Sequence, residues 1–426
     1  MKRPPLTQAD RVYFAIAAAG GAAYVYRFAT PFGNVSLFRI AILVGALLWL
    51  LRWIRFGVDR VALRVLPLFG AALFGPGLDF LQLSEDSPHR IGVIAYCVNL
   101  AGMAVMFSAI ASRAALLEAL RWFCYAAAAS IVVAWYAWAT GEIPGEELVR
   151  MFGSDYGREL AYLNVNEGTV RLTGPFFDPN FFGAYLVMTM SICQALWSVE
   201  RKRRWLILAA ACAVSLLATT SRTALLGLVV LVALGGEQSM RDVGKRLLTF
   251  VAATIVLVPI VGEFWDGFYD RLLNTDLTSR LEFLERGWHA FLQAPMLGAG
   301  SSILEDPETG YATAHTLYLS ALANYGLIGG SLLLFFVFAP LAVVMQRRAD
   351  RSSRRFVFAI LLPLAAMYLT YDFFLVLEFQ FLLFAMVYAI AFRGISIATT
   401  SRASVSVPNR VGVVEPAPDF LEKNSC

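Results

Sequence analysis

Arg222 and Arg280 each follow a serine that has the spacing of a helix start. A serine hydroxyl at this position accepts a hydrogen bond from a free backbone N–H, and Glu282 completes a capping-box spacing with Ser279. Each arginine would then be the first residue of its helix, where a cation opposes the helix dipole. An anion bound between the two arginines would explain both placements, because free N–H groups and guanidinium groups together bind phosphate. The alternative is that each arginine reaches lipid headgroups or pairs with a local carboxylate.

His315 begins a long apolar stretch and is the third candidate for chemistry. In AHTLYLSALANYGLIGG (314–330), Tyr318 follows on the same helical face. A neutral imidazole accepts a proton near neutral pH, which suits a general base that activates a hydroxyl group. The alternative is an interfacial histidine that is hydrogen-bonded to a neighbouring loop.

The segment RLTGPFFDPNFFGAYL (171–186) carries the remaining polar candidates. Asp178, Pro179 and Asn180 have the pattern of a helix cap and first turn, where proline is tolerated. This pattern favours a structural role for Asp178 and Asn180. Arg171 is interpreted as a third basic group that faces the same outer cavity as Arg222.

The composition identifies an integral membrane protein. Hydrophobic residues make up 58% of the chain and charged residues 15%, and the mean hydropathy is +0.64. A soluble domain has about 45–50% apolar and 25% charged residues. Apolar stretches of roughly 17–25 residues, long enough to cross a bilayer, recur along the sequence at about 12–29, 35–51, 65–83, 91–110, 121–139, 176–198, 205–219, 222–236, 247–264, 315–345, 356–371 and 373–392.

These stretches predict an all-α polytopic membrane protein of about 12 transmembrane helices. They form one transmembrane domain over residues 1–393, followed by a polar tail at 394–426 that is expected to be disordered. Loops at about 140–175 and 265–314 are longer than most connections, which is typical of functional loops. Both contain apolar residues at helical spacing. In the second loop, Leu281, Leu284, Trp288 and Phe291 form one stripe, which predicts a helix in the membrane interface.

The basic residues predict the orientation. They precede the first stretch and follow the even-numbered ones, at Lys2, Arg3, Arg11, Arg52, Arg55, Arg60, Arg64, Arg113, Arg121, RKRR (201–204), Arg241, Lys245, Arg246 and QRRADRSSRR (346–355). Basic loops remain on the cytoplasmic side, so both termini are predicted to be cytoplasmic and the two long loops to be outside. The net charge of +4 therefore reflects topology and gives no indication of nucleic-acid binding.

Some chemistry is not supported by the sequence. The five cysteines and three histidines do not have metal-ligand spacing, and no glycine-rich phosphate loop for a nucleotide is evident. We therefore expect no metal and no cofactor. Arg39 and Glu378 are polar residues inside apolar stretches, and both are predicted in the outer half of the membrane, where they would form a buried ion pair.

Four motifs resemble those of the bacterial O-antigen ligase and polymerase superfamily and occur in the same order. They are RLTGPFFDPN, SRTALLGL (221–228), SRLEFL…PMLGAG (279–300) and the His315 segment. Arg222 to Leu226 matches the family's Arg-x-x-x-Leu element. His315 through Gly326 and Gly329 matches its His-x10-Gly-x-x-Gly element, with Thr316 where Asn, Ser or Gln is commoner. The motifs cover about 171–345, and the topology is similar over the whole chain.

The resemblance implies an inverting, metal-independent glycosyltransferase with a GT-C-like fold in the bacterial inner membrane. Its donor would be a glycan on undecaprenyl diphosphate, and its acceptor a hydroxyl group of lipid A-core or of a growing polysaccharide on the periplasmic side. By this analogy Arg222, Arg280 and His315 are catalytic, and Arg171, Asn180 and Tyr318 contact substrate. Partners would include other polysaccharide-assembly proteins.

Two further readings stay open. An exopolysaccharide polymerase or a protein O-oligosaccharyltransferase of the same superfamily would carry the same motifs. A transporter or flippase of an anionic lipid-linked sugar could also use arginines on the outer face, although no inverted repeat is evident.

Overall fold

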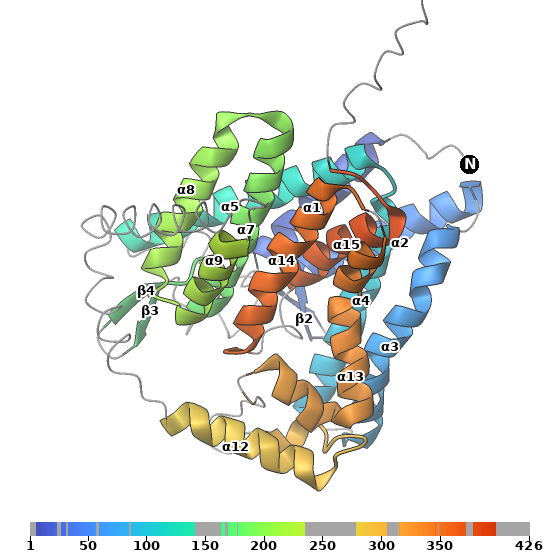
Figure 1. Cartoon of the computed structure of the whole chain (residues 1–426), viewed down its shortest axis with the longest axis vertical. Helices are drawn as coiled ribbons and strands as arrows, with labels where there is room; N and C mark the ends of the chain where they lie inside the picture. The colour runs from blue at the N-terminus through green and yellow to red at the C-terminus, as the bar shows by residue number, and fades with distance from the viewer. Residues whose placement is uncertain are drawn as a thin grey trace, which may run out of the picture.

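The chain forms a helical bundle with two small β-hairpins (Figure 1). The computed structural model describes residues 6–23, 27–30, 33–56, 59–84, 87–140, 163–166, 169–176, 178–234, 278–304, 314, 316–347, 349–371 and 378–397. The α-helices of this part are α1 (Gln8–Ala22), α2 (Leu37–Phe56), α3 (Arg60–Gln82), α4 (Pro88–Ala109), α5 (Arg113–Thr140), α7 (Pro179–Glu200), α8 (Arg203–Ala218), α9 (Arg222–Leu234), α12 (Thr278–Gln293), α13 (Leu317–Gln346), α14 (Arg351–Tyr368) and α15 (Glu378–Arg393).

The prediction of a helical membrane protein is confirmed. Among the described residues, α3, α4, α5, α7 and α13 are long and apolar enough to span a bilayer, and the other helices apart from α12 lie within or close to the predicted stretches. Helix α12 lies in the predicted long loop at about 265–314. The stretch at 247–264 lies outside the described residues, so the number of about 12 spans stays a prediction.

The all-α prediction missed two hairpins. Strand β1 (Arg27–Thr30) pairs with β2 (Gly33–Ser36), and β3 (Leu163–Asn166) pairs with β4 (Thr169–Leu172). Both pairs are antiparallel, and each strand has only four residues. Strands this short carry too few residues for a period-two pattern to be recognised.

The bundle has two chemically different ends. The basic end is the one that carries the α7–α8 turn with Arg201, Lys202, Arg203 and Arg204. Arg121 near the start of α5 donates to Glu200 there, at 2.6 Å. The motif end is the opposite one, where α8 ends and α9 begins. In Figure 1 the α7–α8 turn lies at the top, and α12 crosses below the bundle.

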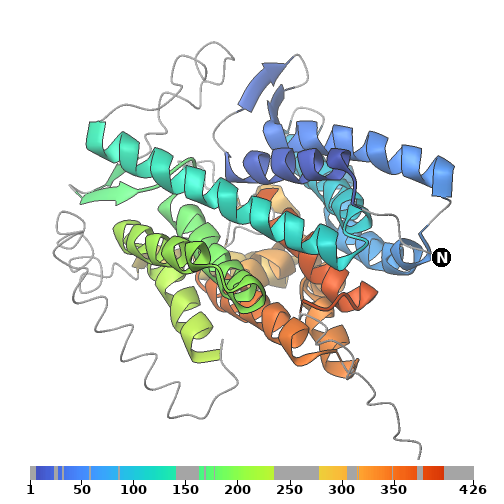
Figure 2. The same cartoon turned by 90° about the horizontal axis from the view of Figure 1, so that it is seen from above.

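One hydrophobic core joins all the long helices. Seen from above (Figure 2), α5 runs between the N-terminal helices and the α7–α9 group, and it packs against both α1 and α7. The core is closely packed where α7 meets α9, because a side chain at Gly183 would collide with Ala224. The glycine thus lets the start of α9 approach α7.

The predicted ion pair between Arg39 and Glu378 is confirmed. The Nε atom of Arg39 lies 3.7 Å from Oε1 of Glu378, whose side chain is only 1% exposed. Ser36 at the end of β2 donates to the same oxygen at 2.6 Å. A carboxylate buried this deeply requires such partners.

The polar tail begins later than residue 394. Ile395 and Ile397 are buried, and Arg113 donates to the Ile397 carbonyl oxygen at 3.0 Å. The hydroxyl group of Ser353 donates to the Ile395 carbonyl at 3.3 Å. Residues 394–397 therefore belong to the bundle, and the rest of the tail lies outside the described residues.

Candidate active site

Arg222 is the first residue of α9, as its serine cap predicted. The Ser221 hydroxyl accepts a hydrogen bond from the Ala224 N–H at 3.1 Å, which is an N-cap contact. The preceding Thr220 has φ 48°, a left-handed conformation that is uncommon for a β-branched residue. Thr219, Thr220 and Ser221 are all buried, and Arg222 is half-buried. The first three residues of the turn 219–222 are therefore packed inside the protein, and Arg222 is its most accessible residue.

Arg171 on β4 binds this turn directly. Its Nε–H donates to the Thr219 carbonyl at 3.1 Å and to the Thr220 hydroxyl at 3.0 Å. The residue is only 7% exposed. The structure thus connects Arg171 to the turn that precedes Arg222. That both arginines face one outer cavity stays a prediction. The predicted contact of Arg171 with substrate stays a prediction.

Asn180 holds the turn from a second side. Its Oδ1 atom accepts a hydrogen bond from the Ser221 hydroxyl at 2.6 Å. Asp178 caps α7 by accepting from the Asn180 N–H at 2.6 Å, and Pro179 is the first helical residue. The expected helix start at Asp178–Asn180 is therefore confirmed.

The end of α14 holds the site from a third side. Thr370 donates to the hydroxyl of Thr223 at 2.9 Å, and the Tyr371 hydroxyl donates to Asp178 at 2.7 Å. These two contacts connect α14 to the first turns of α9 and α7. The sequence did not indicate either contact, because threonine and tyrosine near a helix end have many common structural roles.

Helix α12 begins at Thr278, two residues before the predicted first helical position. Arg280 is therefore its third residue, and its side chain lies outside the described part. Leu281 and Trp288 of the predicted stripe are 60% and 50% exposed, whereas Gly287 is buried where α12 meets α13. The helix thus packs on the bundle at Gly287 and leaves Leu281 and Trp288 uncovered, whereas Leu284 and Phe291 of the stripe are half-buried.

Helix α13 is broken at Gly326, the first glycine of the predicted His-x10-Gly-x-x-Gly element. Its φ of 66° and ψ of −173° are accessible essentially only to glycine. Backbone groups on both sides of the break bond to the segment after α12: Leu327 N–H to Pro295 O at 2.8 Å, and Ala299 N–H to Ala323 O at 2.9 Å. Segment 295–300 therefore satisfies groups that the break leaves without helical partners.

Gly329, the second glycine of the element, lies where α3 crosses α13. A Cβ atom there would lie 2.7 Å from the Cβ of Tyr325 and 2.9 Å from the Cα of Gly75 on α3. Glycine is thus required at the two motif positions for different reasons. Gly326 adopts a backbone conformation that other residues avoid, and Gly329 lies too close to Tyr325 and Gly75 for a side chain.

Asp79 is a polar residue of this junction that the sequence analysis missed. It is 2% exposed, and its Oδ1 atom accepts a hydrogen bond from the Ser301 N–H at 3.0 Å, at the start of the 3₁₀ helix η2 (Ser301–Leu304). The sequence does show Asp79 as a lone carboxylate inside the apolar stretch 65–83. This placement could have indicated a specific partner, because buried charges in membrane spans are usually paired.

His315 lies outside the described residues, whereas its neighbours are placed. The Thr316 hydroxyl caps α13 by accepting from the Leu319 N–H at 3.1 Å. Tyr318 is half-buried, and its hydroxyl donates to the Ala365 carbonyl on α14 at 3.1 Å. This bond joins α13 to α14, and the predicted substrate contact of Tyr318 stays a prediction.

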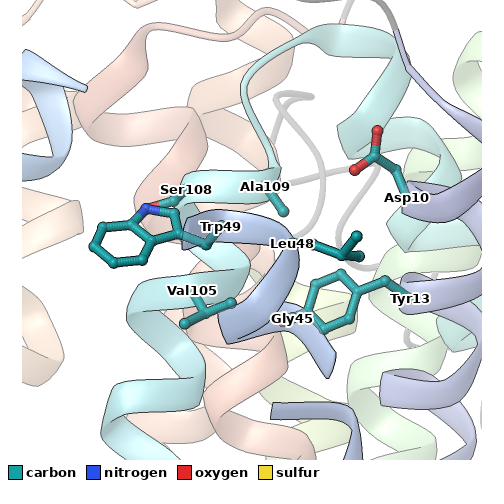
Figure 3. Close-up of a pocket in the computed structure, with 8 residues that line it drawn as sticks. All are labelled: Asp10, Tyr13, Gly45, Leu48, Trp49, Val105, Ser108 and Ala109. Carbon is teal, nitrogen blue, oxygen red and sulfur yellow. The ribbon is translucent and has the colours of Figure 1, made fainter. Parts of the chain in front are cut away.

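A small pocket lies elsewhere in the bundle, and Figure 3 shows the residues that line it. It is formed by α1, α2 and α4 and is lined by Asp10, Tyr13, Gly45, Leu48, Trp49, Val105, Ser108 and Ala109. Asp10 already accepts hydrogen bonds from the backbone and hydroxyl of Thr7, both at 2.8 Å. Asp10 therefore has a structural role in the cap of α1. We take the motif end, and not this pocket, as the candidate site.

Fold and site together define a class, a helical membrane protein that presents a capped, half-buried arginine at one end of its bundle. Residues 206–335 match the Wzy_C family, whose description is O-antigen ligase. The matched segment includes Arg222, Arg280 and His315. This match supports the resemblance to the O-antigen ligase and polymerase superfamily that the motifs predicted. No curated protein matches the sequence.

Proposed function

We propose that this protein is an inverting, metal-independent glycosyltransferase of the O-antigen ligase type. It moves a glycan from undecaprenyl diphosphate to an acceptor hydroxyl group on the periplasmic face of the bacterial inner membrane. The acceptor is a sugar of lipid A-core or of a growing polysaccharide. The observation that carries the proposal is the family match over 206–335, which includes all three predicted catalytic residues.

The diphosphate is bound by Arg222 and Arg280 in this proposal. The start of α9 supports this role, because Arg222 lies at the serine-capped N-terminus of a helix. Such a terminus stabilises an anion, and a guanidinium group adds a bidentate contact. Arg280 lies in the first turn of α12, which belongs to the same matched family segment.

The reaction is a displacement at the anomeric carbon. The acceptor oxygen attacks this carbon while the bond to the diphosphate oxygen breaks, and the configuration inverts. His315 accepts the hydroxyl proton as a general base. Negative charge develops on the departing undecaprenyl diphosphate, and preorganised guanidinium groups stabilise it. The high-energy diphosphate linkage drives the transfer, so the reaction uses no nucleotide.

The polyprenyl chain of the donor needs an apolar surface next to the diphosphate. The exposed stripe of α12, with Leu281 and Trp288, supports a place for this helix in the membrane interface. We propose that α12 forms one wall of the lipid path to the site.

The decisive experiment uses purified protein in liposomes with an undecaprenyl-diphosphate-linked glycan and an acceptor. We expect glycan transfer and release of undecaprenyl diphosphate without ATP or an ion gradient. Movement of intact donor across the bilayer without its consumption would instead identify a flippase.

The acceptor class is tested separately, by gel analysis of surface polysaccharide from a deletion strain. Loss of chain length with one repeat retained identifies a polymerase. Loss of attachment with accumulation of lipid-linked polymer identifies a ligase, and loss of glycan from a protein band identifies a protein O-oligosaccharyltransferase.

A further inference from the structure

We infer that Arg171 and Asn180 are positioning residues that hold the turn 219–222 and thereby direct Arg222. The inference deepens the proposed function, because it concerns how that site is built. It rests on five hydrogen bonds that meet at this turn.

The Nε–H group of Arg171 is directed to the turn. Its Nε–H group is shared by the Thr219 carbonyl and the Thr220 hydroxyl, at 3.1 and 3.0 Å. Arg171 belongs to the β3–β4 hairpin, which lies far from the turn in sequence. A long-range contact to a backbone carbonyl fixes the path of the chain, since the bond is lost if the turn rotates.

Asn180 acts on the next residue of the turn. The Ser221 hydroxyl donates to Asn180 and at the same time accepts from the Ala224 N–H. A serine hydroxyl has one donor and two acceptor positions, so the bond to Asn180 orients the proton and leaves the lone pairs toward the helix. The amide oxygen of Asn180 therefore supports the cap that starts α9.

The turn requires such support because its conformation is unfavourable. Thr220 adopts φ 48°, and left-handed backbone is disfavoured for L-residues with a branched Cβ. A second bond inside the turn runs from the Ser221 N–H to the Thr219 hydroxyl at 3.2 Å. Arg171 and Asn180 stabilise this strained turn. Because Arg222 is the last residue of the turn, they also fix the direction in which its side chain leaves the backbone.

The first test is a double-mutant cycle with Asn180→Ala and Ser221→Ala, measured as kcat/KM for the lipid-linked donor. If Asn180 acts through Ser221, each single variant loses on the order of tenfold, and the double variant is no worse than Ser221→Ala alone. Losses that multiply would show that Asn180 contacts the substrate independently and would overturn its positioning role.

The second test needs no activity. A cysteine at Arg222→Cys is labelled with an impermeant maleimide, and we expect Arg171→Gln to raise the labelling rate several-fold because the turn loosens. Leu281→Cys on α12 is the matched control, whose rate should not change if the fold is intact. An unchanged rate at position 222, with the control also unchanged, contradicts the role of Arg171.

The two tests separate this inference from the proposed function. A wild-type protein that does not consume the donor refutes the proposed function, while the labelling experiment still tests the turn. A wild-type protein that transfers glycan, combined with multiplying losses in the cycle, refutes only the positioning role of Asn180.

Discussion

At the scale of single residues, the neighbours of Arg222 determine where its charge lies. Ser221 supplies the helix cap, and Thr223 bonds to the end of α14. The arginine opposes the helix dipole at this position, so its placement does not favour the stability of α9.

The first prediction concerns the geometry of this charge. Arg222→Ala should reduce glycan transfer about 10²-fold or more, the range seen when one preorganised donor is removed. Arg222→Lys should recover little, because an ammonium group cannot form the bidentate fork. Donor turnover in vesicles and donor binding are the measurements, and Arg280→Ala and Arg280→Lys should behave in the same way. Full activity of both lysine variants would show that charge alone is sufficient.

The second prediction separates His315 from the arginines. His315→Ala should lose about 10²–10⁴-fold in turnover, the usual contribution of a general base, yet bind the lipid-linked donor normally. In wild-type protein the rate should fall at acidic pH, because a protonated imidazole cannot accept the hydroxyl proton. A binding defect as large as that of Arg222→Ala would assign His315 to the diphosphate instead.

At the scale of elements, the broken helix α13 depends on segment 295–300. The break exposes backbone groups, and the segment bonds to them from the side. A Cβ atom at Gly326 would also collide with the Met296 carbonyl group. The glycine therefore permits both the conformation and the docking.

The third prediction follows from this docking. Gly326→Ala should destabilise the protein by about 1–3 kcal/mol, the usual cost of a disfavoured backbone conformation, with a lower Tm in detergent. Gly92→Ala on α4 is the matched control, since a Cβ there meets no described atom within 4 Å and alanine favours a helix. Equal Tm values for the two variants would show that the break tolerates a side chain.

At the scale of the whole molecule, the basic end and the motif end lie at opposite ends of the same helices. Helix α7 connects them, from Pro179 to Glu200. If the basic end is cytoplasmic, then Arg222 and α12 lie on the periplasmic side.

The fourth prediction tests this orientation with two exposed positions. Leu281→Cys, at a residue that is 60% exposed, should be labelled by an impermeant maleimide in cells with a permeable outer membrane. Lys202→Cys, whose native side chain is 57% exposed at the basic end, should be labelled only after lysis of the inner membrane. The opposite pattern would place Arg222 in the cytoplasm and would refute the proposed function.

The sequence by itself determined the class of protein, the approximate positions of most helices and two helix starts. These features are local or compositional: apolar length decides membrane insertion, and the caps at Ser221 and Asp178 depend on residues within one turn. The pairing of Arg39 with Glu378 was also predictable, because a charge in an apolar stretch requires a partner at the same depth.

The tertiary structure alone decided how the candidate site is held together. Arg171 and Thr219 are 48 residues apart in the sequence. The partners of two other contacts at the turn are 41 and 147 residues apart. Hairpins of four-residue strands and the docking of segment 295–300 on Gly326 leave no periodic pattern. Such contacts form only when the helices pack, since the pairing of distant polar groups depends on three-dimensional distance and not on local propensity.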